Sequence, residues 1–242
     1  MKDSSLGRLL GVLLAPGDTF QSIAGRPTWV LPLLVLVLLG GAVQWLLQTR
    51  VDPDELFREQ IRRVGVELSP QQMEKAQEQQ ARSGSPKAKV IFGVLLVAVL
   101  NFVVAAMFWM GFRLFGSEIE YVPALSTTLY GFVPLGLAAL LNTVVILARG
   151  SVEAAEVLSG GVLPSNLGFF APEDSGLVAQ GMLQSVDLFS IWTIVLLVIG
   201  FRITAKVSRG TAIGVVLGIW LIGIALKAGL LALPALLMGG GS

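Results

Sequence analysis

The chain has 242 residues, of which 54% are hydrophobic and only 14% are charged, and its mean hydropathy is +0.78. A soluble domain of this length does not cover so much apolar surface, so lipid is its expected environment. A formal net charge of +1 gives no reason to expect nucleic acid, and the absence of cysteine and histidine excludes disulfides, thiolate and imidazole chemistry and nearly all zinc or haem ligation.

Residues 1–26 are predicted to form a cytoplasmic amphipathic segment. A helix over residues 4–14 would gather five leucines on one face: Leu6, Leu9, Leu10, Leu13 and Leu14. This stretch is too short to cross a bilayer, so we expect a helix that lies in the membrane interface. The segment also lacks the small-residue cleavage site of a signal peptide.

Five later segments are apolar over about 20 residues, the length at which a helix crosses a bilayer. They are expected at 27–49, 89–112, 123–148, 186–205 and 211–238. Pro134 predicts a kink in the third of them. Because none of the segments alternates as barrel strands do, the sequence predicts an all-α membrane protein. We expect one five-helix domain over 27–238, followed by a tail or linker at 239–242.

Two long connections separate these spans. The connection at 50–88 is expected to be helical, because Asp52-Pro53 and Ser69-Pro70 are both typical helix starts. The connection at 149–185 is acidic. Basic residues in the short connections favour a cytoplasmic N-terminus and an extracytoplasmic C-terminus, although the many bases of 50–88 oppose this orientation.

Two ionisable residues of the last spans are candidates for function, as charged groups within membranes often are. Asp187 stands at the start of the fourth span and Lys227 lies within the fifth. If these spans form a tight antiparallel hairpin that turns near 207–210, the two residues face each other. We predict an ion pair near the outer leaflet. The alternative is that Asp187 caps its helix while Lys227 extends alone to the interface.

Small and polar residues of the spans have two interpretations each. Glycines recur every four residues in the fifth span, at Gly210, Gly214 and Gly218. This ridge predicts close helix packing, either within the chain or in a homo-oligomer. Asn101, Thr127 and Asn142 could line a polar path through the membrane, or they could form ordinary hydrogen bonds between helices.

No set of residues predicts a catalytic centre. Metalloprotease and serine–histidine chemistry both need histidine, and the sequence has no phosphate-binding loop. Glu153 and Glu156 are spaced to share a helix face and could pair, with or without a metal. A solvated helix start after Gly150-Ser151 explains them more simply. We therefore expect no catalytic residues, no metal ligands and no cofactor.

Four stretches carry a resemblance to a known family. They are APGDTFQSIAGRPTWVLPLLV before the first span, ALSTTLYGFVPLGL in the third, DLFSIWTIVLLVIGFRI in the fourth and SRGTAIGVVLGIW in the fifth. Over about residues 11–235 the chain resembles the Yip-domain (Ypt/Rab-interacting protein) family of integral membrane proteins, in its bacterial branch. The resemblance implies a five-helix domain with a cytoplasmic N-terminus and a C-terminus on the far side.

The resemblance also bears on partners. Eukaryotic members are linked to Rab-type GTPases, vesicle traffic and membrane shaping, but the family supplies no catalytic residues to carry over. The long acidic tail of many eukaryotic members is missing here, which argues against GTPase binding.

The expected function is that of a non-enzymatic scaffold, assembly factor or accessory subunit of a transport, export or trafficking system in the bacterial inner membrane. Expected partners are membrane lipids and other membrane proteins such as a transporter complex, with a homo-oligomer as an open alternative and no nucleic acid. The alternative function is a small channel or transporter with a polar path near Lys227. A membrane enzyme that uses Glu153 and Glu156 ranks third.

Overall fold

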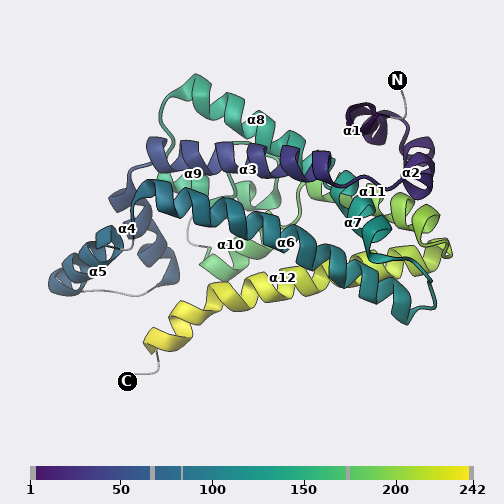
Figure 1. The fold of residues 1–242 in the computed structure, drawn as a ribbon. Coiled ribbons are helices and arrows are strands. Elements are labelled where there is room, and N and C mark those ends of the chain that lie inside the picture. Colours follow the sequence, from purple (N-terminus) through teal and green to yellow (C-terminus); the bar gives the residue numbers. More distant parts are fainter. Residues whose placement is uncertain (1–3, 66–68, 83, 173–174, 240–242) are drawn as a thin grey trace. The chain divides into compact units, whose positions relative to one another are not determined.

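Helices make up nearly all of the regular structure in the computed structural model, which describes residues 4–65, 69–82, 84–172 and 175–239 (Figure 1). They are α1 (Ser5–Leu14), α2 (Pro16–Gly25), α3 (Val30–Arg50), α4 (Pro53–Val64), α5 (Pro70–Arg82), α6 (Pro86–Leu114), α7 (Tyr121–Gly131), α8 (Val133–Arg149), α9 (Ala154–Leu158), the 3-10 turn η1 (Leu167–Phe170), α10 (Leu177–Gln184), α11 (Leu188–Thr204) and α12 (Arg209–Gly239). Within these residues the only β-type pairing is one isolated bridge. The predicted all-α class is confirmed.

Four stretches among the described residues are long and apolar enough to cross a membrane. They are Val30–Arg50, Lys87–Leu114, Tyr121–Arg149 and Arg209–Leu233. The predicted fourth span corresponds to α11, which is apolar but has only 17 residues. The chain is therefore built as a multi-pass membrane protein.

The third of these stretches is interrupted, as the proline in it predicts. α7 ends at Gly131 and α8 begins at Val133. Pro134 has no N–H to donate to the carbonyl four residues earlier, which belongs to Tyr130. The N–H groups of Leu135 and Gly136 donate instead to the Phe132 carbonyl, at 2.9 and 3.2 Å.

The connection at 50–88 is helical, and its helices begin where the sequence predicts. The Asp52 carboxylate accepts from the backbone N–H of Asp54 at 2.9 Å, and Pro53 follows in the first turn of α4. Ser69 and Gln72 form a reciprocal capping box at the start of α5, with hydrogen bonds of 2.9 and 3.3 Å. Residues 66–68, between the two helices, lie outside the described part of the chain.

The chain divides into two compact units. Unit 1 comprises Met1–Gly41, Val94–Leu140 and Leu188–Ile222, and unit 2 comprises Ala42–Gly93, Leu141–Asp187 and Gly223–Ser242. In unit 1, the Phe201 ring of α11 stacks on Phe112 of α6 with ring centroids 4.5 Å apart. Unit 2 has its own buried cluster, formed by Val51, Ile146, Val152 and Val162.

In unit 1, Arg8 attaches α1 to α2. Only 2% of Arg8 is exposed. Its guanidinium donates to the Ser22 hydroxyl at 2.8 Å, to the Arg26 carbonyl at 2.7 Å and to the Thr28 hydroxyl at 3.1 Å. Such dense hydrogen bonding compensates for the water that a buried guanidinium loses.

Some leucines of α1 pack inside unit 1, and the others are exposed on its surface. Leu9 and Leu13 pack against the buried cluster that includes Val12 and Phe20. Three others stay exposed: Leu6, Leu10 and Leu14. The single leucine face predicted for this helix is thus partly used inside unit 1, and the exposed remainder is suited to lipid.

The connections at 115–120 and 205–208 meet in unit 1. The Ser117 hydroxyl donates to the Ala205 carbonyl at 2.7 Å and accepts from the Ile119 N–H at 3.2 Å. Ser117 is 8% exposed, so this is a buried contact between the ends of α6 and α11.

Gly200 of α11 allows α2 and α7 to pack closely on that helix. A Cβ added there would lie 2.8 Å from both Phe20 Cε1 and Thr127 Cγ2. We therefore expect Gly200→Ala to lower the free energy of unfolding by about 1–3 kcal/mol. Thermal unfolding of the purified protein, followed by tryptophan fluorescence, measures the change.

The matched control is Gly223→Ala in α12, where an added Cβ meets no atom within 4 Å. Alanine favours a helix over glycine by up to about 1 kcal/mol, so this variant should be unchanged or slightly more stable. Equal destabilisation of both variants would contradict the packing described for unit 1.

Candidate functional site

In unit 2, the connections at 50–88 and 149–185 are joined where they leave the long helices. The Arg50 guanidinium, at the end of α3, donates to the Gly150 carbonyl at 2.8 Å, and the Val152 N–H donates to the Arg50 carbonyl at 3.2 Å. Gly150 has a positive φ of 79°, which turns the chain sharply at the end of α8. Val51 and Val152 are buried beside these bonds.

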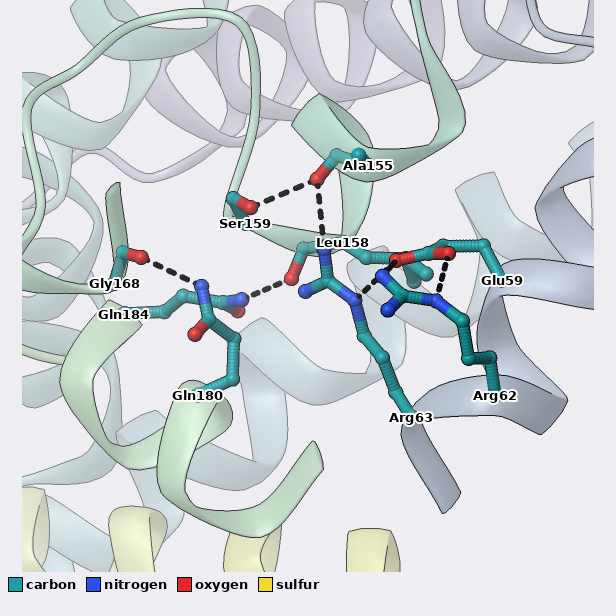
Figure 2. Close-up of polar contacts among 9 residues, drawn as sticks. All are labelled: Glu59, Arg62, Arg63, Ala155, Leu158, Ser159, Gly168, Gln180 and Gln184. Carbon is teal, nitrogen blue, oxygen red and sulfur yellow. Dashed lines mark hydrogen bonds and ion pairs between the residues drawn. The ribbon is translucent and has the colours of Figure 1, made fainter. Parts of the chain in front are cut away.

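An ion-pair cluster within α4 orients Arg63, which in turn bonds to α9 (Figure 2). Glu59 Oε1 accepts from Arg62 Nη2 at 2.6 Å and from Arg63 Nε at 2.8 Å. Arg63 Nη2 donates in turn to the Ala155 carbonyl at 3.3 Å, which links the two helices. The side chains of Arg63 and Glu59 are only 9% and 15% exposed, so this cluster is better shielded from solvent than a surface pair.

The Glu59 carboxylate is held in its charged form. The hydrogen bond from Arg62 lowers its pKa most, the bond from Arg63 also lowers it, and burial opposes both. The net effect lowers the pKa from 4.5 to about 2. The carboxylate that orients Arg63 therefore stays charged over all ordinary pH values.

Three amides, of which Asn166 and Gln180 are buried and Gln184 is half-buried, organise the rest of the connection at 149–185. Gln180 Nε2 donates to the Gly168 carbonyl at 2.6 Å, and Gln184 Nε2 donates to the Leu158 carbonyl (Figure 2). Asn166 packs against Gly160, where a Cβ would lie 2.7 Å from its Nδ2. Gly160 has a φ of 100°, so its backbone also requires glycine. Sequence reasoning missed these amides; the surrounding glycines were the available signal.

The two ionisable residues of the predicted pair also lie in unit 2. Lys227 Nζ lies 3.5 Å from the Ser185 hydroxyl, two residues before Asp187, and the Asp187 charge acts on it electrostatically. Asp187 itself forms the isolated bridge with Asn166. Direct pairing of Asp187 with Lys227 stays a prediction.

The glycine ridge of α12 is open within unit 1. At Gly214 and Gly218 an added Cβ would meet no atom within 4 Å, and at Gly210 it would meet only the Ser208 hydroxyl at 3.8 Å. Packing of another helix on this ridge, from this chain or from a second copy, stays a prediction.

The residues of the predicted polar path are held by local contacts. Asn101 Nδ2 donates to the Val97 carbonyl of its own helix at 2.8 Å. The fully buried Thr127 hydroxyl lies 2.8 Å from the Pro123 carbonyl and 3.0 Å from the Thr204 hydroxyl. Asn142 belongs to unit 2 and packs on Gly161. These contacts are those of helix packing, and a path through these residues stays a prediction.

The two carboxylates considered for chemistry have different surroundings. Glu156 Oε1 accepts from Arg149 Nη1 at 2.6 Å, whereas Glu153 immediately precedes α9 and forms no side-chain cap hydrogen bond. Across the described residues, no group of three acidic side chains is placed to hold a metal ion.

The pKa of Glu59 makes the docking of α4 dependent on pH. Because the folded-state pKa lies below 4.5, the stabilisation is complete above that value and is lost as the pH falls toward 2. At pH 4.5, where Glu59 is charged, we expect pepsin to cleave within residues 53–64 faster in Glu59→Gln than in the parent protein, because the variant loses the ion pairs and loosens α4 by about 1–2 kcal/mol. At pH 2 the rates of the two proteins should approach each other. Comparing both proteins at the same pH removes the effect of pH on pepsin itself.

Glu74→Gln, on the exposed surface of α5, is the matched control and should behave as the unmodified protein. Cleavage rates that are the same for Glu59→Gln and the parent protein at both pH values would contradict the role of the cluster.

Comparison with known proteins agrees with this architecture. The family model of the Yip1 domain matches residues 10–230. The chain is also 27% identical over 203 residues to "Membrane protein YknW" of Bacillus subtilis (strain 168), covering 83% of this chain and 80% of that protein. No solved structure matches the chain. The chain thus belongs to the Yip1 domain family and is a multi-pass membrane protein.

Proposed function

We propose that this protein is a non-enzymatic scaffold, assembly factor or accessory subunit of a membrane transport, export or trafficking system. The observation that carries the proposal is the docking of α4 on α9. The charged side chains there are engaged with one another: Glu59 is bound by Arg62 and Arg63, and Arg63 also bonds to the Ala155 carbonyl of the other connection. They support a fixed surface outside the long helices, which is what a partner protein needs for recognition.

We propose that the chain crosses the membrane five times. Contacts within unit 2 keep 50–88 and 149–185 on one side, and contacts within unit 1 keep 115–120 and 205–208 together. α6 has 29 residues and joins 50–88 to 115–120, so we place these two groups of connections on opposite sides of the membrane. α11 joins the same two groups, so it would also cross. Its 17 residues span about 25 Å, the lower limit for a bilayer.

The proposed orientation has a cytoplasmic N-terminus in the bacterial inner membrane. Arg26, Arg113, Arg202, Lys206 and Arg209 all fall in or beside the short connections on the side of the N-terminus. Short basic connections favour the cytoplasm. The helical connection at 50–88 would then lie outside, and its bases are the one feature of the sequence that opposes this orientation.

A channel or transporter has less support. Asn101 and Thr127 each donate to a carbonyl of their own helix, which is the usual role of polar residues in helix packing. The name of the B. subtilis relative states only that it is a membrane protein.

A photo-crosslinking amino acid at exposed positions of α4 and α5 tests the proposed function. We expect a crosslinker at Arg58 or Glu74 to give one discrete adduct with another membrane protein in living cells. The adduct should weaken in the Glu59→Gln background, where α4 is no longer held on α9. A crosslinker at Leu217 of α12, an exposed apolar position, is the control and should give lipid or no adduct.

The purified protein provides a second test of the proposed function. When it is reconstituted in liposomes, it should mediate no flux of solutes or ions. Flux that depends on Asn101 or Lys227, together with the absence of any protein adduct from α4 or α5, would favour the transporter and contradict the proposed role.

A further inference from the structure

A hollow in unit 1 opens between α3, α6 and the start of α8. Its volume is about 280 Å³, close to the lower end of the range of small-molecule sites. Leu100 of α6 and Leu135 of α8 line it and are 47% and 37% exposed, so the hollow is open to the surface of these helices. The described residues that line it carry no charge and are nearly all apolar. The exception is Asn101 of α6.

The hollow lies at the centre of three stretches that are long enough to cross a membrane. Gly40, Asn101 and Leu135 all line it, and they are central residues of the first three apolar stretches, which have 21, 28 and 29 residues. At a helical rise of 1.5 Å per residue, each of them is about 15–21 Å from the ends of its stretch. The hollow therefore faces the acyl chains of the bilayer rather than the lipid headgroups.

Asn101 brings an unpaired hydrogen-bond acceptor to this depth. The residue is more than nine-tenths buried, and its amide nitrogen donates to the Val97 carbonyl at 2.8 Å. Its oxygen, Oδ1, accepts from no group in the described part of the chain. The unpaired polar atoms that are fully enclosed there are Asn166 Oδ1 and Thr193 Oγ1, so Asn101 Oδ1 can be reached from the hollow. An amide oxygen in hydrocarbon is stabilised by any group that donates to it.

Two glycines set the room in the hollow. At Gly136 of α8 an added Cβ would lie 3.1 Å from Leu36 Cδ2, so α8 and α3 are already in close contact there. At Gly40 of α3 an added Cβ would meet no atom within 4 Å. Because Gly40 lines the hollow, this open space belongs to it, and a larger side chain at position 40 would occupy it.

We propose that this hollow binds an uncharged long-chain alcohol from the membrane. The hydroxyl of such a molecule donates to Asn101 Oδ1, and its chain lies against the apolar residues of α3, α6 and α8. The proposal does not depend on the role proposed for α4 and α9.

The lining and the depth of the hollow decide between possible occupants. The acyl chain of a phospholipid fits the apolar wall, but it carries no O–H or N–H that could donate to Asn101 at this depth. A charged ligand would lose its hydration without meeting an opposite charge in the wall. A neutral molecule with a hydroxyl group satisfies the amide oxygen and the apolar wall together.

Photoaffinity labelling of the purified full chain in lipid nanodiscs tests the proposal. The probe is farnesol that carries a photoreactive diazirine, and mass spectrometry identifies the labelled residues. We expect labels within residues 97–104 and 132–139. At equal concentration in the membrane, unlabelled farnesol should displace the probe about fivefold more effectively than farnesyl methyl ether, which has no O–H. This factor is the effect of one neutral hydrogen bond.

Two variants locate the interaction. Asn101→Leu keeps the size of the side chain but removes the acceptor, so farnesol and its methyl ether should become equally effective. Gly40→Val should abolish the labelling, because it fills the hollow. Gly223→Val is the matched control: an added Cβ there also meets no atom within 4 Å, but Gly223 does not line the hollow, and the labelling should be unchanged. Thermal unfolding shows whether each variant folds, and Gly40→Val still tests the site if Asn101→Leu does not.

Three results would overturn the proposal. Equal displacement by farnesol and its methyl ether in the unmodified protein means a groove for acyl chains only. A preference for farnesol that persists in Asn101→Leu means that the hydroxyl is bound elsewhere. Labels that are unchanged in Gly40→Val, or that are reduced equally in Gly223→Val, mean general contact with lipid rather than a site.

Discussion

The Arg63 guanidinium contacts the Glu59 carboxylate of its own helix and the Ala155 carbonyl of another, and much of the structure depends on that bridge. It attaches the long connection after α3 to the connection after α8. Both connections are rich in polar backbone and side chains, which cannot enter hydrocarbon without partners. Docking them on each other satisfies many of these groups outside the membrane. It also restricts which helices can cross, since both connections must lie on one side.

The same connections bind several of the chain's polar side chains. Two carboxylates are bound by arginines: Glu59 by Arg62 and Arg63, and Glu156 by Arg149. The buried amide of Gln180 and the half-buried amide of Gln184 donate to backbone carbonyls. These side chains thus hold the connections of unit 2 in place.

Elements that depend on local sequence could be predicted. Runs of apolar residues located the long helices, Asp52-Pro53 and Ser69-Pro70 located the starts of α4 and α5, and Pro134 located the break between α7 and α8. These signals act over a few residues, through helix capping, hydrogen bonding and hydrophobic length.

Features that depend on distant residues could not be predicted. Nothing near Arg8 indicates that Ser22, Arg26 and Thr28 will surround it, and nothing near Arg63 indicates the Ala155 carbonyl. The proposed contact of Asp187 with Lys227 depends likewise on how α11 and α12 turn, and hydropathy says nothing of that.

The proposed topology is tested most directly by determining on which side of the membrane each connection lies. Because the chain contains no cysteine, single cysteines can be placed at Glu74, Glu153, Glu118 and Arg209 without other changes. The account predicts that a membrane-impermeant maleimide, added to spheroplasts, labels the cysteines at 74 and 153, whereas those at 118 and 209 react only after permeabilisation. Opposite labelling of 74 and 153, or equal labelling of 153 and 209 before permeabilisation, would contradict the docked connections and the crossing of α11.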